Sequence, residues 1–466
     1  MRWGHTALVC LVVGLVGCNN AATGPTITLN IAASVDQTGT SGSKSWVDTL
    51  NMAMTDLNAG LATAKSAIRF ALVLSDSVNT PTITVPKVID AVQNQKAIGV
   101  ITDTSQDDVA INMVHYDADA TNDLNVPIVG STVSSPLINN PAAVDSNAIK
   151  QAAYQNAMHW NFRVTMSSAA EAKAFVAQAL SRGTNGDVDG NGTVKIAVYY
   201  TNEASGKGLA DAIAATMAIA RPDAKVELIG VNSSDAAFNV NTHDFAADMK
   251  LLTDDKNETT GATDGPPDFI CETAFPQIGE AIMKAYLDGG YSTFFFHPHG
   301  FRTGSITSAL GAAINGQEGI SYIVTDGTSG AAYATQFQST YGYAATGHDS
   351  NFYDCVSVLS MAALTAIRGV PDASKVTGAQ VRDAISQLNT VGGEPIAIGA
   401  ADFAKAAGLI AAGKPINLVG ASGPLDFDAN GNVLNKLVHW RIVNSTFTDV
   451  ELFDCTKSPD CPLTPL

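Results

Sequence analysis

The chain has 466 residues, of which 46% are hydrophobic and 15% charged, and its formal net charge at pH 7 is −18. One hydrophobic core does not normally support a chain of this length, so at least two lobes are expected. The acidic balance argues against two kinds of partner, nucleic acid and anionic lipid bound through a polybasic surface.

The chain begins with a segment that is typical of a secretory signal. An apolar run at residues 7–16 follows the basic residue Arg2 and ends shortly before Cys18. The run is too short to span a bilayer, and a small residue precedes the cysteine. We therefore expect the rest of the chain to work outside the cytoplasm.

The junction Leu15-Val16-Gly17-Cys18 resembles a bacterial lipobox. The resemblance implies a signal peptide at residues 1–17, acylation of the Cys18 thiol, and a tether at residues 18–25. Two or three acyl chains anchor a protein stably where one does not. The alternative is an ordinary cleaved signal with an incidental cysteine. The lipid is the only membrane contact expected, on either bacterial membrane or at the cell surface.

Strands and helices alternate in the first third of the chain. Short apolar or alternating segments predict strands, and apolar stripes at helical spacing predict helices. The strands are expected at residues 27–31, 68–74, 97–102 and 126–130, and the helices at 46–57 and 85–92. This repeat of strand, helix and strand predicts a parallel sheet covered by helices on both faces.

The pattern restarts after Phe162-Arg163-Val164. Ser168 and Glu171 predict a capping box that opens a helix ending near Arg182. Further strands are expected at residues 194–200, 225–231, 268–272, 293–297 and 322–325, with helices at 208–220, 244–252 and 277–288. A helical block (353–368, 380–388, 402–411) and a hairpin at 437–443 close the chain. The sequence therefore predicts two sheets of one design in tandem.

Two polar inserts, at residues 183–193 and 253–267, interrupt this plan. The first contains Asp187-Val-Asp189-Gly-Asn191-Gly192, which matches the opening of a calcium loop. Val198 stands where such a loop needs a carboxylate, so we favour a solvated turn over a calcium site. The similar segment at residues 426–431 predicts a hairpin turn.

Four cysteines remain outside the signal and its junction: Cys271, Cys355, Cys455 and Cys461. In an oxidising compartment such residues can pair, and the short loop between Cys455 and Cys461 favours a disulfide within the tail. For Cys271 and Cys355, a bridge and an inert buried thiol both stay open. None of the four is expected to be catalytic.

Four stretches, in this order and spacing, resemble substrate-binding proteins of branched-chain amino acid ABC transporters. They lie at residues 47–58, 125–136, 194–210 and 423–431. The resemblance implies the type I periplasmic binding protein fold, an α/β fold with two Rossmann-like lobes. Each lobe holds a parallel sheet, and a hinge of three chain crossings joins them.

The same resemblance implies the lobe boundaries. Lobe 1 is expected at residues 26–162 plus 327–420, and lobe 2 at residues 163–326 plus 421–453. A C-terminal tail follows at residues 454–466. Such lobes close over a ligand held between them.

Open α/β sheets bind ligands at the carboxyl ends of their strands. After the strand at 97–102 come Thr104, Ser105 and Gln106, and after the strand at 126–130 come Thr132 and Ser134. The resemblance implies that these two loops hold a ligand carboxylate with hydroxyls and with backbone N–H groups at helix starts. The alternative is that these residues are only helix caps and turn formers.

The second lobe departs from the family pattern. Ser205 stands where the family has a tyrosine that covers the ligand, and His299, in Pro298-His299-Gly300, stands where it has an acid that pairs with the ligand ammonium. Phe275 is expected to supply an aromatic wall. A neutral imidazole cannot replace the missing charge. These departures argue against an ordinary α-amino acid and leave a carboxylate-bearing or small polar ligand.

No enzyme motif is found: there is no Gly-x-Ser-x-Gly, no phosphate loop and no His-Glu-x-x-His. His297 and His299 would need a third ligand to bind a metal, so neither a metal nor a cofactor is expected. The leading hypothesis is a lipid-anchored solute-binding protein that serves an ABC importer, with the permease and a small molecule as partners. The alternatives are a lipid-anchored sensor domain of the same fold and a structural envelope protein with a degenerate cleft.

Overall fold

The computed structural model describes residues 26–39, 42–233, 238–258, 260–274, 276–323, 327–345, 347–456 and 463–465. Three residues of the sequence predictions lie outside this part of the chain: Cys18, Phe275 and Cys461. Cys455 takes part in a disulfide, so its pairing with Cys461 stays a prediction. Cys271 and Cys355 are free and buried.

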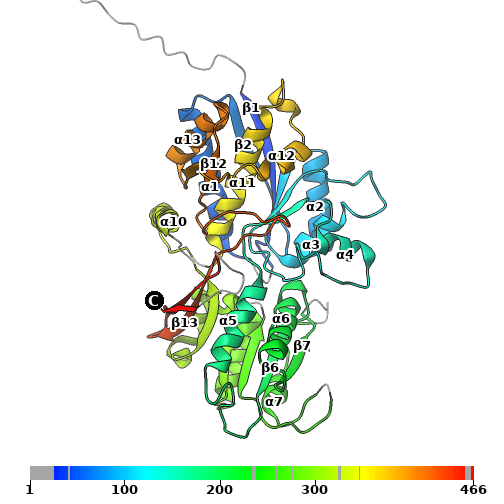
Figure 1. The fold of residues 1–466 in the computed structure, drawn as a ribbon, viewed down its shortest axis with the longest axis vertical. Helices are drawn as coiled ribbons and strands as arrows, with labels where there is room; N and C mark the ends of the chain where they lie inside the picture. Colours follow the sequence, from blue (N-terminus) through cyan, green and yellow to red (C-terminus); the bar gives the residue numbers. More distant parts are fainter. Residues whose placement is uncertain are drawn as a thin grey trace, which may run out of the picture.

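The first sheet has five parallel strands in the order β2-β1-β3-β4-β5. Its strands are β1 (Ile27–Val35), β2 (Ile68–Asp76), β3 (Ala97–Thr102), β4 (Ile128–Gly130) and β5 (Asn161–Arg163). Between them run α1 (Lys44–Thr63), α2 (Pro81–Gln93), α3 (Ser105–Met113) and α4 (Ala148–Gln155). We call this sheet and the helices packed on it lobe 1; it forms the upper half of Figure 1.

Later parts of the chain return to complete lobe 1. They are α10 (Gly327–Tyr341), α11 (Asp349–Ile367), α12 (Gly378–Ile385), α13 (Ala400–Ala411) and the two-stranded sheet of β11 (Glu394–Ile396) and β12 (Ile416–Leu418). One buried apolar cluster joins Ile31 of β1, Leu50 of α1 and Leu359 of α11. Helix α11 is the one described helix that is long and apolar enough to cross a membrane, but 83% of its apolar window is buried, as suits a core helix.

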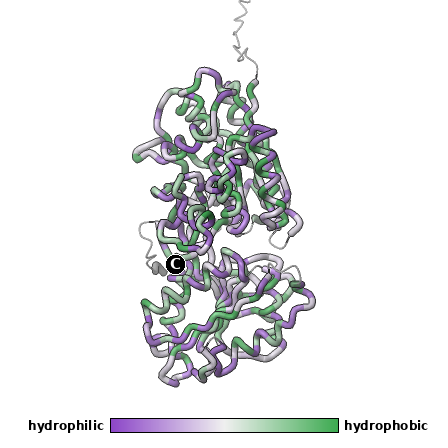
Figure 2. Tube along the Cα trace, turned by 90° about the vertical axis from the view of Figure 1, so that its right-hand side faces the viewer, coloured by the Kyte–Doolittle hydropathy of each residue, from purple (hydrophilic) through white to green (hydrophobic). Residues whose placement is uncertain are grey.

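The second sheet has eight strands in the order β15-β14-β13-β10-β9-β8-β6-β7. Its parallel strands are β6 (Lys195–Thr201), β7 (Lys225–Val231), β8 (Phe269–Thr273), β9 (Phe294–His297) and β10 (Glu318–Tyr322), and its antiparallel edge is β13 (Lys436–Val443), β14 (Thr446–Asp454) and β15 (Leu463–Pro465). The helices are α5 (Ser168–Leu180), α6 (Ala204–Ala220), α7 (Phe245–Thr253), α8 (Pro276–Asp288) and α9 (Gly304–Leu310), with short 3₁₀ turns at η1 (His299–Phe301) and η2 (Gly311–Ile314). We call this part lobe 2, and Figure 2 shows the two lobes stacked along the long axis.

The predicted fold class is confirmed: two α/β lobes, each built on parallel strands. The predicted strands at 97–102 and 225–231 coincide with β3 and β7. The strand predicted at 322–325 begins earlier, since β10 covers Glu318–Tyr322, and residues 324 and 325 lie outside the described part of the chain. Sequence periodicity missed this start because Glu318 is charged. Arg441 and Arg182 pair with the Glu318 carboxylate, so a charge is tolerated in the sheet. The exact lobe boundaries stay predictions.

The hairpin turn predicted at residues 426–431 is wrong. The hairpin of β13 and β14 turns at Asn444 and Ser445, whose φ angles of 51° and 59° are typical of a type I′ turn. The 426–431 segment is a local turn instead, in which Asp428 accepts hydrogen bonds from the backbone N–H of Asn430 (2.8 Å) and Asn432 (2.9 Å). Its Gly431 carbonyl accepts from the Arg163 N–H, which fixes the turn against β5.

A close contact between β3 and α11 generates a stability prediction. A Cβ at Gly99 would lie 2.5 Å from Cδ2 of Leu359, which is fully buried. Gly99→Ala should therefore lower the free energy of unfolding by about 1–3 kcal/mol through overpacking, and Leu359→Ala by about 2–5 kcal/mol through a cavity. In the double variant the new methyl enters the cavity, so the loss should be smaller than the sum of the two. Urea unfolding of the four proteins measures this coupling, and strict additivity would contradict it.

Candidate ligand-binding cleft

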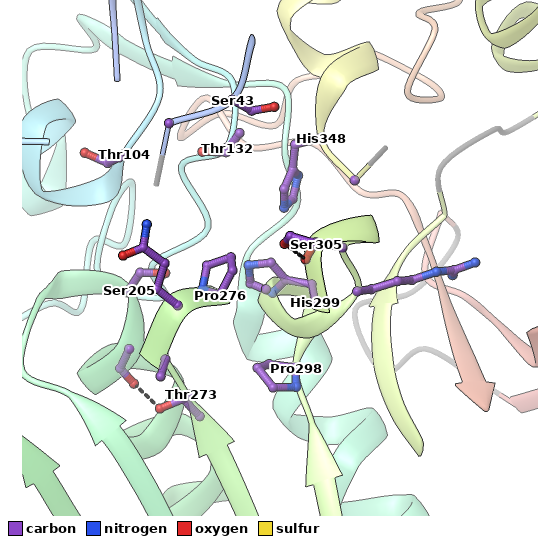
Figure 3. Close-up of a pocket in the computed structure, with 18 of the residues that line it drawn as sticks. Ser43, Thr104, Thr132, Ser205, Thr273, Pro276, Pro298, His299, Ser305 and His348 are labelled. Atoms are coloured by element: carbon purple, nitrogen blue, oxygen red, sulfur yellow. Dashed lines mark hydrogen bonds between the residues drawn. The ribbon is translucent and has the colours of Figure 1, made fainter. Parts of the chain in front are cut away.

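A cavity of about 510 Å³ lies between the two lobes, at the carboxyl ends of their parallel strands. From lobe 1 it is lined by Gly42, Ser43, Trp46, Thr104, Ser105, Thr132, Gly347 and His348. The lobe 2 side includes Glu203, Ser205, Thr273, Pro276, Glu280, His299 and Arg302. Figure 3 shows Ser43, Thr104 and Thr132 above the cavity, Ser205 and His299 below it, and His348 between the two sets.

Two helices of lobe 1 begin at the cavity. Ser43 is the N-cap of α1 and its side chain does not cap the helix, whereas the Thr104 hydroxyl of α3 accepts from the Asp107 N–H at 3.4 Å. The first N–H groups of a helix lack intrahelical partners, and the helix dipole makes this end positive. The lobe 1 wall is therefore suited to an anionic group such as a carboxylate.

Two residues of the predicted carboxylate site do not line the cavity. Gln106 turns its amide to Asn79, donating to the backbone oxygen at 2.6 Å and to Oδ1 at 2.8 Å. Ser134 is fully buried, and its Oγ lies 3.2 Å from Oγ of Ser205 across the lobe boundary. The other described candidates do line the cavity, namely Thr104, Ser105, Thr132, Ser205 and His299. Their roles in binding stay predictions.

The lobes touch beside this serine pair. A Cβ at Gly208 of α6 would lie 2.9 Å from Cδ of Pro136 and 3.1 Å from Oγ of Ser135. Only a residue without a side chain therefore lets the start of α6 approach the loop that follows β4 this closely.

A buried carboxylate binds both the backbone N–H and the ring of His299. Glu171, 2% exposed, accepts hydrogen bonds from the His299 backbone N–H and from its ring Nδ1, both at 2.7 Å. Burial disfavours the imidazolium, but the Glu171 charge outweighs burial, so the pKa of His299 is raised. The predicted capping box is wrong, because Ser167 is the N-cap of α5 and Glu171 is directed to His299.

Three rings pack together beside the cavity: His299 and His348, which line it, and Tyr322, which does not, with centroid separations of 4.9–5.1 Å. Burial and the neighbouring His299 lower the pKa of His348 to about 3, so its imidazole is neutral at physiological pH. His297 lies in the core instead, with its ring stacked on Phe301 at a centroid distance of 3.8 Å. The two histidines of the His-x-His motif thus have different partners.

Sequence reasoning missed Glu203, the N-cap of α6. It is 8% exposed and lines the cavity. Its carboxylate accepts from the N–H groups of Ser205 (2.7 Å) and Gly206, and from the Thr201 hydroxyl (2.9 Å). The sequence signal that could have identified Glu203 is its position just after the buried strand β6, at the edge of the sheet where ligands bind.

Among the described residues, one group of acidic side chains is close enough together to hold a metal ion. It consists of Asp187, Asp189 and Asp268, whose carboxylates lie within 4.8 Å of one another. Asp187 accepts from the N–H groups of Gly190 (2.7 Å) and Gly192 (2.9 Å), as in a polar turn. These contacts agree with a turn held by its own backbone, and the preference for a solvated turn stays a prediction.

No protein-family model matches the sequence, and no curated protein matches it. Solved structures do match the fold. A leucine-binding protein from Thermotoga maritima has a TM-score of 0.62 at 14% identity, covering 91% of this chain and 98% of that one. A substrate-binding protein of a branched-chain amino acid transporter from Streptococcus pneumoniae, solved with isoleucine, has 0.59 at 14%, covering 90% and 98%. A solute-binding protein of an ABC transporter from Rhodopseudomonas palustris, solved with 3,4-dihydroxybenzoic acid, has 0.63 at 13%, covering 93% and 99%.

These similarities establish that the chain has the two-lobed fold of leucine-binding and related ABC transporter solute-binding proteins, as the sequence resemblance implied. At 13–14% identity they establish the fold alone.

The His299–Glu171 pair generates a pH prediction. The folded-state pKa of His299 is raised above the ordinary histidine value of 6.5, so the pair's contribution to stability is complete below pH 6.5 and is lost as pH rises through the folded pKa. The free energy of unfolding of wild type relative to His299→Gln should therefore be larger at pH 5.5 than at pH 8.5. Urea unfolding at several pH values measures the difference. In the Glu171→Gln background the difference should no longer favour pH 5.5, because burial then acts on the imidazolium without the Glu171 charge. A flat wild-type profile would contradict the assignment.

Proposed function

We propose that the chain is an exported, lipid-anchored solute-binding protein that captures a small carboxylate-bearing ligand between its lobes and delivers it to an ABC importer. The observation that carries this proposal is the 510 Å³ cavity between the lobes, with the starts of α1 and α3 and several hydroxyls on one wall. The protein itself performs no chemistry on the ligand.

The fold neighbours support a carboxylate as the shared feature of the ligand. Isoleucine and 3,4-dihydroxybenzoic acid, which occupy two of them, both carry one. In this chain Thr104, Ser105 and Thr132 are the residues that would hold it, together with backbone N–H groups at the helix starts.

The cavity also bears on the alternatives. Its volume falls within the range of about 300–1,000 Å³ typical of small-molecule sites, which favours a working cleft over a degenerate one. A sensor domain would use the same cleft, so importer and sensor are distinguished by the partner: the importer hypothesis expects a permease that co-purifies with the ligand-bound protein.

Ligand capture is tested by thermal shift against a metabolite library, followed by small-angle scattering with each binder. A ligand at 100 times its dissociation constant should stabilise the native state by about 2.7 kcal/mol if it binds that state alone. The radius of gyration should fall as the lobes close. Gly208→Val should bind the same ligand more weakly, because its side chain meets Pro136 and Ser135. A library without a binder, or an unchanged radius with a confirmed binder, would count against capture by closure.

The lipid anchor is tested separately with Cys18→Ala. The variant has no thiol to acylate, so it should lose labelled-acyl incorporation and detergent-phase partitioning, while its ligand binding stays unchanged. Cys10→Ala is the matched control because Cys10 lies within the predicted signal. Unchanged acyl labelling in Cys18→Ala would show that the junction is an ordinary signal.

A further inference from the structure

Two histidine side chains from different lobes meet at the cavity. His299 lies in η1 of lobe 2, His348 lies just before α11 of lobe 1, and both line the cavity. Figure 3 shows the His348 ring directed from the lobe 1 side toward His299. The ring centroids are 5.1 Å apart, and the ring planes are at 85° to each other. The two imidazoles are therefore close neighbours across the boundary between the lobes.

This separation matches that of two imidazoles bound to one metal ion. When two imidazoles bind a tetrahedral Zn²⁺ at Zn–N distances of about 2.0–2.1 Å, with each ring centre about 1.1 Å beyond its nitrogen, the centroids are about 5.2 Å apart. The observed separation of 5.1 Å is close to that value. A metal ion between the rings therefore requires little movement of either lobe, provided that each ring has a nitrogen available.

Each ring has one unused nitrogen. Nδ1 of His348 is buried and has no hydrogen-bond partner among the described residues. On His299, Nδ1 contacts Glu171, and no hydrogen bond in the described part of the chain involves Nε2. A buried polar atom without a partner is uncommon in folded proteins and calls for an explanation. A metal ion bound by both nitrogens would satisfy the buried Nδ1 of His348.

Glu171 orients His299 for this role. Its carboxylate lies 2.7 Å from Nδ1 of the ring and also accepts the His299 backbone N–H. Metal-binding histidines commonly donate their other ring N–H to a carboxylate in this way, which orients the ring and leaves the second nitrogen for the metal. Glu171 is 2% exposed, so little solvent screens its charge from a cation held by this ring. It is thus a positioning residue.

The surroundings of the two rings indicate the class of metal and leave room for further ligands. Imidazole nitrogen suits zinc, copper and nickel, whereas Ca²⁺ and Mg²⁺ prefer oxygen ligands. The Tyr322 ring packs against both imidazoles, at centroid distances of 4.9 and 5.1 Å. Both imidazoles also face the cavity. Water or an oxygen of a bound solute can therefore complete the coordination, as in metal sites that keep a position open.

We propose that Nε2 of His299 and Nδ1 of His348 bind one divalent transition-metal ion of the zinc class at the boundary between the lobes, with its remaining positions open to the cavity. Metal binding at this place is a property separate from solute capture and does not depend on it. His297, the other histidine of the His-x-His motif, lies in the core and takes no part. The proposal reverses the expectation from the sequence that no metal binds.

The first experiment is calorimetry of Zn²⁺ and Ni²⁺ binding to the full chain, without an affinity tag, after treatment with EDTA and removal of the chelator. Wild type should bind one ion that depends on both histidines. His299→Gln and His348→Gln should each weaken its binding by at least about 10- to 100-fold, the loss typical of removing only a positioning residue. The control is His159→Asn, because His159 is exposed, does not line the cavity, and has a φ of 56° that asparagine tolerates.

Three outcomes of this experiment overturn the proposal. The first is a wild-type protein that binds neither ion. The second is binding that both histidine variants retain, which would assign the ion to another place, such as the group of Asp187, Asp189 and Asp268. The third is a loss confined to one of the two variants. Solute capture is judged by the metabolite library, so either conclusion can fail while the other stands.

The second experiment counts nitrogen ligands in wild type, so its result does not depend on whether a variant folds. Electron paramagnetic resonance of the protein with one equivalent of Cu²⁺ should show hyperfine coupling to two imidazole nitrogens, and to one in His299→Gln or His348→Gln. Glu171→Gln should keep both nitrogens but bind Zn²⁺ about 10- to 100-fold more weakly. A wild-type spectrum with coupling to a single nitrogen, or to none, would overturn the proposal.

Discussion

A single buried guanidinium joins the parts of the molecule that form the cleft. Arg163, at the end of β5, is 2% exposed and donates to the Ser135 carbonyl (2.7 Å), the Val133 carbonyl (3.3 Å) and Oδ1 of Asn432 (2.7 Å). Burial lowers its pKa to about 10, so it stays charged at neutral pH. A buried charge must keep its partners. Arg163 therefore fixes the loop after β4, which carries the cleft residues, to the chain that returns toward β13.

On either side of Arg163, each lobe has apolar clusters of its own. Lobe 1 has its apolar cluster around Ile31 and Leu359, and lobe 2 has separate clusters around Val198 and Tyr199. The contacts beside the cleft are few and small, notably the pair of serine hydroxyls and Gly208 against Pro136. Separate cores joined by small contacts are the arrangement that hinge closure requires.

Periodicity predicted the buried strands well, since a strand such as β3 is apolar throughout and has no competing pattern. It missed α3, whose first turn carries Asp107 and Asp108 and whose apolar stripe is weak. The orientation of Gln106 depends on how that helix is rotated, which local sequence does not specify. Glu171 was assigned to its own helix cap, yet its carboxylate serves His299, 128 residues away. Sequence reasoning failed for side chains whose charged partners lie far away in the chain.

The helix starts at the cavity differ in what already occupies them. Helices α1, α3 and α6 all begin at the cavity, and each start attracts negative charge. At α6 the Glu203 carboxylate already takes the free N–H groups of Ser205 and Gly206, so this start presents a negative group to the cavity. At α1 the Ser43 side chain does not cap the helix, and the Trp46 N–H donates to the Ser43 carbonyl at 3.2 Å. A negative group of a ligand is therefore better placed at the lobe 1 helix starts than at the start of α6.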